Sequence, residues 1–104
     1  TPFPEGTEGI ALRRTMDEVW MPKLKEYKPE LIMVSAGFDA HREEDQAQLL
    51  MVERDYAFLG RRLASCKSEI PECRGVVAVL EGGYNTSSLA RSCAAFIHQL
   101  ACTD

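Results

Sequence analysis

The sequence predicts an α/β fold in the order helix, strand, helix, strand, helix, with the two strands parallel. Three observations predict it: two short apolar runs without alternation, an amphipathic stretch between them, and apolar residues at helical spacing on either side. Because 104 residues leave room for only one core, we treat residues 1–104 as a single domain.

The first helix is predicted from apolar residues that recur every three or four positions after Gly9. They are Leu12, Met16, Val19, Trp20, Leu24 and Tyr27. Pro22 lies inside this pattern, and proline lacks the N–H that a helix interior needs. We therefore expect Pro22 to bend the helix or to divide it into two pieces.

The two strands are predicted from the runs LIMVSAGFD, which begins at Leu31, and VVAVL at residues 76–80. Unbroken apolar character suggests that each strand is covered on both faces. A helical stripe lies between the runs and predicts a crossover helix, hence a βαβ unit; its residues are Val52, Tyr56, Leu59, Leu63 and Cys66. A closing helix follows, with Asn85 or Thr86 as its cap and apolar positions at Leu89, Cys93, Phe96, Ile97 and Leu100.

Both strands are more hydrophobic than a parallel sheet of only two strands requires, because such a sheet buries little surface. Small domains already bury a low fraction of their surface. We therefore expect the sheet to continue with strands from elsewhere, either a missing part of a longer parent protein or a second copy of this chain.

Composition excludes several classes of function. The net charge of −4 gives no basic face for nucleic acid. No apolar run approaches the roughly 20 residues that cross a bilayer, and the first residues lack a signal-peptide pattern, so we predict a cytoplasmic protein. In that compartment the four cysteines are expected to be reduced apolar fillers, with a disulfide framework as the minor alternative.

The residues after each strand are candidates for chemistry, because ligands bind beyond the carboxyl ends of parallel strands. Asp39 and Tyr84 would then project over the same edge. A carboxylate can bind a divalent metal, and a tyrosine hydroxyl can donate to an oxyanion. From the residues alone, Asp39 is more simply a turn or cap residue, and Tyr84 a packed core residue beside a tight Gly82-Gly83 turn.

The other polar residues in these loops are expected to be solvated. His41 lies nearer the candidate site than His98, which we expect on the surface of the last helix. The acidic run Glu43-Glu44-Asp45 is most simply a solvated loop, although three carboxylates could also bind a cation weakly.

The segment PELIMVSAGFDAH, followed by VVAVLEGGYN, resembles the paired signatures of the histone deacetylase and acetylpolyamine amidohydrolase family, especially its bacterial and class II-like members. The opening PFPEGT and the stretch ERDYAFLGRRL are also similar to parts of that family. The resemblance covers essentially the whole chain. It implies the C-terminal portion of the deacetylase-type three-layer α/β/α fold.

The resemblance also implies roles for particular residues. Asp39 matches one of three protein ligands of a catalytic zinc, and Tyr84 matches the tyrosine whose hydroxyl polarises the acetyl carbonyl and stabilises the oxyanion. The residues that would line the acyl-lysine tunnel are Gly82, Gly83, Phe38 and Gln46. Gln46 departs from the family pattern, in which an aspartate, a proline and an apolar residue occupy the places of Glu44, Asp45 and Gln46.

The departures shape the functional prediction. The other two zinc ligands and the tandem histidines of the family have no counterpart in this sequence. We therefore predict the C-terminal part of a zinc-dependent deacetylase acting on acetyl-lysine or acetylpolyamine, inactive without the missing N-terminal part of the domain. The alternative is an independently encoded deacetylase-like module, homodimeric, with a binding or structural role. Two copies that assemble a site from Asp39, His41 and Tyr84 are a third hypothesis.

Overall fold

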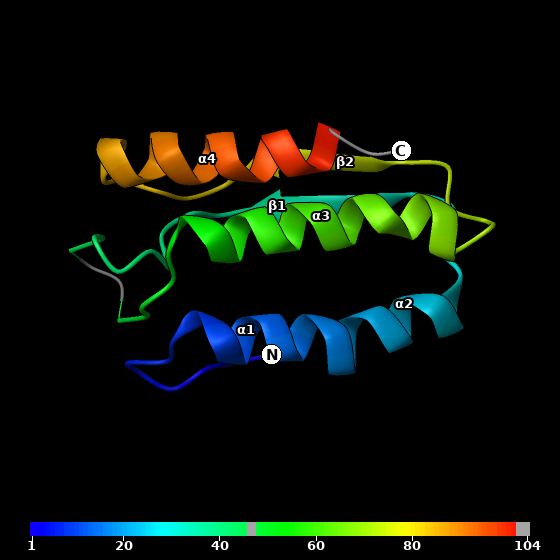
Figure 1. Cartoon of the computed structure of the whole chain (residues 1–104), viewed down its shortest axis with the longest axis horizontal. Helices are drawn as coiled ribbons and strands as arrows, with labels where there is room; N and C mark the ends of the chain where they lie inside the picture. Colours follow the sequence, from blue (N-terminus) through cyan, green and yellow to red (C-terminus); the bar gives the residue numbers. More distant parts are fainter. Residues whose placement is uncertain (46–47, 102–104) are drawn as a thin grey trace.

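The computed structural model describes residues 1–45 and 48–101 and has the predicted order of elements (Figure 1). Helix α1 (Gly9–Thr15) leads through the π-helical segment η1 (Met16–Trp20) into α2 (Met21–Tyr27). Strand β1 (Ile32–Ala36), helix α3 (Glu53–Glu69), strand β2 (Val76–Leu80) and helix α4 (Thr86–Ala101) follow. The α/β prediction is confirmed.

The α-helical pattern around Pro22 comes as two pieces, α1 and α2, as predicted. Residues 16–20 join them in a wider π-helical turn, in which the Met21 N–H bonds to the Met16 carbonyl five residues back, and α2 follows without a gap (Figure 1). Proline leaves the carbonyl four residues before it without a partner, and a wide turn immediately upstream accommodates that loss without a break. Helix α2 ends at Tyr27, and Lys28 caps it with a left-handed backbone (φ 57°) and an N–H that bonds to the Leu24 carbonyl at 2.9 Å.

Strands β1 and β2 pair in parallel, with Ile32 opposite Val76 and Ala36 opposite Leu80. Helix α3 connects them and packs between α4 and α1 (Figure 1). Asn85 caps α4 as predicted, since its side-chain Oδ1 accepts the Ser88 N–H at 3.0 Å.

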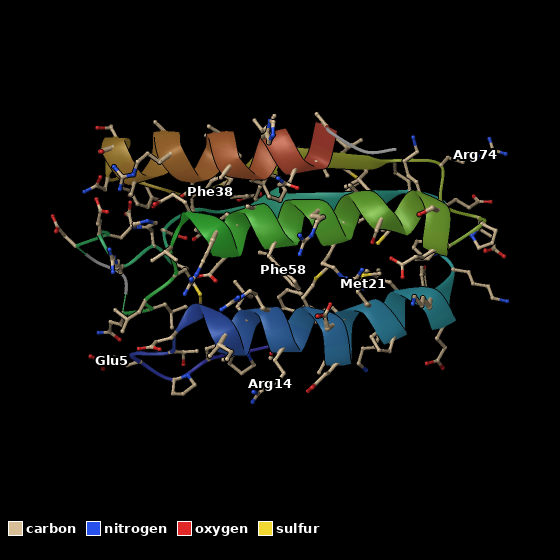
Figure 2. All side chains as sticks on the ribbon, viewed as in Figure 1. Glu5, Arg14, Met21, Phe38, Phe58 and Arg74 are labelled. Carbon is tan, nitrogen blue, oxygen red and sulfur yellow. The ribbon has the colours of Figure 1, made fainter. Side chains whose placement is uncertain are left out.

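The core occupies the space between the helices and one face of the sheet. One cluster contains Met16, Met21, Ile32, Cys66, Ile70 and Cys73, and a second contains Leu12, Phe38, Met51, Tyr56 and Phe96. Figure 2 shows Met21 directed towards α3, whereas Arg14 on the same helical rod points outward. Cys66, Cys73 and Cys93 are free thiols, as predicted, and burial raises the pKa of the Cys66 thiol to about 11. Cys102 lies outside the described residues.

The other face of the sheet has no cover from the described part of the chain. Met33 is 71% exposed, and Val77 and Val79 are about half exposed. The expectation of strands covered on both faces is therefore not met within this chain, whose described residues make one helical layer against a sheet. The two strands carry more apolar side chains than the described part of the chain covers.

Candidate functional site

The loops that follow β1 and β2 are joined to each other by backbone hydrogen bonds beyond the end of the sheet. The Glu81 N–H bonds to the Ala36 carbonyl at 3.1 Å, and the Phe38 N–H bonds to the Gly82 carbonyl at 2.7 Å. These bonds continue the parallel pairing past the last strand residues. The prediction that the two motifs share one edge is confirmed.

Asp39 lies directly against Gly82. A Cβ atom added at Gly82 would come within 2.8 Å of the Asp39 Oδ2, and one at Gly37 within 3.3 Å of its Oδ1. Glycine at position 82 therefore makes room for this carboxylate. Asp39 is exposed, and no described residue donates a hydrogen bond to its side chain. Its oxygens are left available to a ligand.

Gly83 turns the chain into Tyr84. Its φ of +135° is one that L-residues rarely adopt, and an added Cβ would lie 2.8 Å from the Leu89 Cδ1. Tyr84 itself is 72% exposed at the same edge as Asp39. It is not the packed core residue that was the alternative interpretation from sequence.

The predicted lining residues divide into three cases. Gly82 and Gly83 lie at the edge, in contact with Asp39 and Leu89 respectively. Phe38 is buried in the core, with its ring centroid 5.0 Å from that of Tyr56 and 5.8 Å from that of Phe96. In Figure 2 it lies among the elements and not on an open surface. Gln46 lies outside the described residues.

Glu44 corrects the expectation of a fully solvated acidic loop. It is only 6% exposed, and its carboxylate accepts the N–H of Tyr84 at 3.1 and 3.0 Å and the N–H of Asn85 at 2.6 Å. The contact spans forty residues of sequence, so no local pattern signals it. The family resemblance offered the only hint, since an acidic residue is common at this position.

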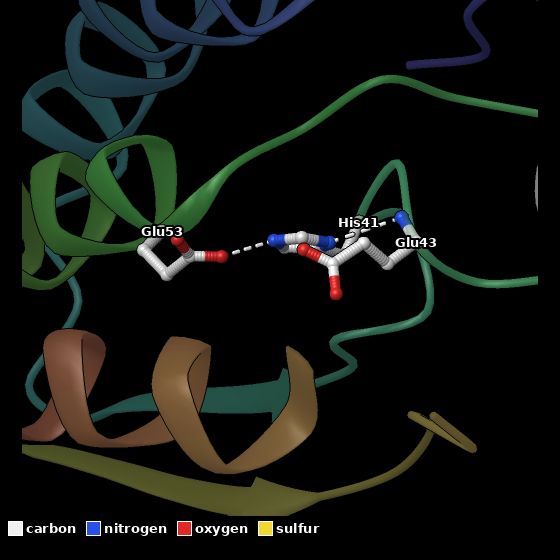
Figure 3. Close-up of side chains that lie close together, drawn as sticks. All are labelled: His41, Glu43 and Glu53. Carbon is white, nitrogen blue, oxygen red and sulfur yellow. Dashed lines mark hydrogen bonds and ion pairs between the residues drawn. The ribbon is translucent and has the colours of Figure 1, made fainter. Parts of the chain in front are cut away.

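His41 corrects a second expectation, because it is fully buried and not solvated. Its Nε2 contacts the Glu53 carboxylate, and its Nδ1 accepts the Glu43 N–H at 3.1 Å (Figure 3). An Nδ1 that accepts this bond leaves Nε2 as the protonated nitrogen that donates to Glu53. His41 therefore links the loop after β1 to the first turn of α3. His98 is exposed on α4, as expected.

Arg91 of α4 completes this network. Its Nη2 lies 2.6 Å from the Glu43 Oε2, and its Nε lies 3.7 Å from the Glu53 Oε1. The Arg91 guanidinium holds the pKa of the Glu43 carboxyl below its ordinary value, and that carboxylate in turn raises the pKa of Arg91. Three elements thus meet around His41.

Among the described residues, potential metal ligands lie in two places: a cluster around His41, and Asp39. His41, Glu43 and Glu53 bring three potential ligand atoms within 4.8 Å of one another, but these atoms already bond to each other, to a backbone N–H and to Arg91. Asp39 belongs to no such group of three. Since a catalytic zinc takes three protein ligands, the described residues fit one part of that site and do not complete it.

Comparison with known proteins identifies the family. Residues 1–100 match the Histone deacetylase domain family. The chain is 38% identical over 94 residues to histone deacetylase 14, chloroplastic, of Arabidopsis thaliana, covering 89% of this chain and 22% of that protein. It is also 38% identical over 85 residues to a probable deacetylase of Archaeoglobus fulgidus, covering 81% of this chain and 23% of that protein.

Solved structures agree with the sequence comparison. The HDA15 HD domain superposes with a TM-score of 0.84 at 25% identity, over 96% of this chain and 28% of that one. An acetylpolyamine aminohydrolase from Burkholderia pseudomallei superposes with a TM-score of 0.81 at 26% identity, over 97% and 28%. The chain thus spans less than a third of these relatives. None of the described helices has the length and apolar character of a membrane span.

Proposed function

Because the chain belongs to the histone deacetylase domain family, we propose that it is the C-terminal part of a zinc-dependent deacetylase that hydrolyses the amide of acetyl-lysine or acetylpolyamine. The observation that carries this proposal is the common edge that holds Asp39 and Tyr84, joined by the bond from Phe38 to Gly82. Both side chains are exposed there, which leaves them open to a metal and a substrate.

Each residue has a role that suits its surroundings. Asp39 has carboxylate oxygens to which no described residue donates a hydrogen bond, so it serves as a zinc ligand. The exposed Tyr84 hydroxyl donates to the oxyanion that forms when the acetyl carbonyl is attacked. Gly82 and Gly83 form the wall of the acyl-lysine tunnel, and Phe38 supports that wall from the core. The chemistry that zinc supplies when bound is polarisation of the carbonyl and activation of water.

The remaining parts of the site come from outside this chain. Asp39 is one ligand where three are needed, His41 is occupied by Glu53, and His98 lies on α4. The partner is therefore the N-terminal part of the same domain, which adds strands to the sheet and covers its exposed face. The chain alone is inactive in this proposal, and nucleic acid and membrane are not partners.

The exposed sheet face favours a second candidate function. Met33, Val77 and Val79 could be covered by a second copy of the chain, which would make a homodimeric module with a binding or structural role. Size-exclusion chromatography with light scattering separates the two proposals. A stable monomer at micromolar concentration contradicts the dimer, and a stable dimer supports it.

Kinetics on acetyl-lysine peptides test the enzyme proposal. We expect turnover from the complete domain with zinc and none from this chain alone. In the complete domain, Tyr84→Phe should lower kcat by about 10²- to 10³-fold, as loss of an oxyanion donor does elsewhere. Asp39→Ala should abolish stoichiometric zinc in metal analysis.

Tyr27→Phe is the matched control, because Tyr27 is an exposed tyrosine at the end of α2 and should leave turnover unchanged. Wild-type turnover in Tyr84→Phe would remove Tyr84 from the reaction. Activity in the isolated chain would contradict the need for a partner.

Location in the cell is a separate question. The cytoplasmic location predicted from the sequence stays a prediction, and relatives from Arabidopsis thaliana and rice carry the word chloroplastic in their names. Fractionation of the tagged full-length protein would decide between these compartments.

A further inference from the structure

Glu44 is a buried charged residue that the proposed reaction does not use. It is 6% exposed, in a loop whose neighbours Glu43 and Asp45 are both exposed. Burying a carboxylate is costly unless hydrogen bonds compensate for its lost hydration. The compensating donors here are the backbone N–H groups of Tyr84 and Asn85.

These donors favour a carboxylate over a neutral amide of the same size. The Tyr84 N–H contacts both carboxylate oxygens, at 3.1 and 3.0 Å, and the Asn85 N–H contacts Oε2 at 2.6 Å. A glutamine whose oxygen took the Oε2 position could still accept both N–H groups, but its NH₂ group would replace Oε1 and face the Tyr84 N–H. Both N–H groups also lie at the start of the 16-residue helix α4, where the helix dipole favours negative charge.

The contact fixes the backbone of Tyr84 from the opposite loop. Tyr84 follows Gly83, whose backbone adopts a conformation open to few other residues, and its side chain is 72% exposed. Among the described residues, Glu44 supplies the only hydrogen bonds to the Tyr84 backbone N–H. It comes five residues after Asp39, so one loop carries both the proposed zinc ligand and the anchor of the proposed oxyanion donor.

We propose that Glu44 is a positioning residue that sets the place of the Tyr84 hydroxyl relative to Asp39. This inference rests on the proposed deacetylase function. Glu44 touches neither substrate nor metal and acts only through the Tyr84 and Asn85 backbone. An oxyanion donor acts by its placement, so loosening this anchor should slow the chemical step and leave substrate binding nearly unchanged.

The test compares three variants of the complete domain with zinc bound. Glu44→Gln should lower kcat by about ten- to a hundredfold, as a misplaced catalytic group does, with little change in KM. Glu44→Asp keeps the charge on a shorter side chain and should recover part of that loss. Asp45→Asn is the matched control, since it removes an exposed charge next in sequence and should behave as wild type.

Two outcomes of the kinetics would overturn the proposal. One is wild-type kcat in Glu44→Gln. The other is an equal fall in Glu44→Gln, Glu44→Asp and Asp45→Asn, which would mean that the loop responds to any change. A fall confined to Glu44→Gln, with partial recovery in Glu44→Asp, supports it.

Amide hydrogen exchange in the wild-type protein keeps the proposal testable if Glu44→Gln does not fold. The Tyr84 and Asn85 amides should exchange slowly, because both are bonded to a buried carboxylate. Exchange of both at unprotected rates would overturn the anchor. If the wild-type domain shows no turnover, the deacetylase proposal fails instead, and exchange still decides whether Glu44 holds Tyr84.

Discussion

The edge that carries the two motifs and the broad outer face of the sheet are organised in opposite ways. At the edge, backbone hydrogen bonds join the loop after β1 to the loop after β2. The buried carboxylate of Glu44 and the buried imidazole of His41 both have partners far away in the sequence. On the outer face, Met33, Val77 and Val79 lie exposed on strands whose composition suits burial.

The comparison separates two requirements of a folded domain. The relative placement of Asp39 and Tyr84 rests on short contacts between the loops after β1 and β2. The removal of water from the sheet depends on layers that this chain does not supply among its described residues. A domain can therefore hold the geometry of one loop edge in a segment that does not complete its own core.

A substitution at Gly83 tests whether the edge is constrained more tightly than the rest of the sheet. Gly83→Ala should lower the free energy of unfolding by about 2 to 4 kcal/mol, because alanine strains the backbone there and its Cβ crowds Leu89. Chemical denaturation measures the change. Gly75→Ala at the opposite end of β2 is the control, since an added Cβ meets nothing within 4 Å there. Equal losses in both variants would show that the edge is not specially constrained.

Sequence reasoning recovered what depends on local periodicity. The strands at residues 32–36 and 76–80, the crossover helix and the Asn85 cap all follow from patterns within a few residues of each other. The π-helical turn before Pro22 was not predicted, because proline restricts the helix without determining how the helix adapts.

The buried polar residues could not be predicted for a different reason. Glu44 and His41 belong to a loop that is polar in sequence, and their burial depends on partners in β2, α3 and α4. The burial of a charged residue is decided by whether distant donors converge on it, and a single sequence does not reveal that. Asp39 and Tyr84 became candidates because ligands bind beyond the carboxyl ends of parallel strands, and the resemblance to a known family made them the principal ones.

The outer face offers a way to sharpen the comparison. Val79→Thr replaces a methyl with a hydroxyl at a position that is 52% exposed, so in this chain it should change stability by less than about 0.5 kcal/mol. In the complete domain the same hydroxyl would be buried without a partner and should cost about 1 to 3 kcal/mol. Denaturation of both proteins measures the difference.

Ile10→Thr is the control for that experiment, because Ile10 is exposed on α1 and not on the sheet. It should be nearly neutral in both proteins. A neutral Val79→Thr in the complete domain would mean that this face stays open to water. The proposal that further layers cover it would then be wrong.

The smallest expected effect concerns Arg91, which joins α4 to both Glu43 and Glu53 at the edge. Arg91→Ala should lower the denaturation midpoint slightly at neutral pH, since exposed ion pairs contribute little. The pKa of Glu43 is lower in the folded protein than its ordinary value of 4.5, so the pair stabilises the fold above that value. As pH falls through the lowered pKa, Glu43 becomes protonated and the difference between Arg91→Ala and wild type should vanish. A difference that persists unchanged at that acidity would show that Arg91 holds the edge by packing and its bond to Ser87, not by charge.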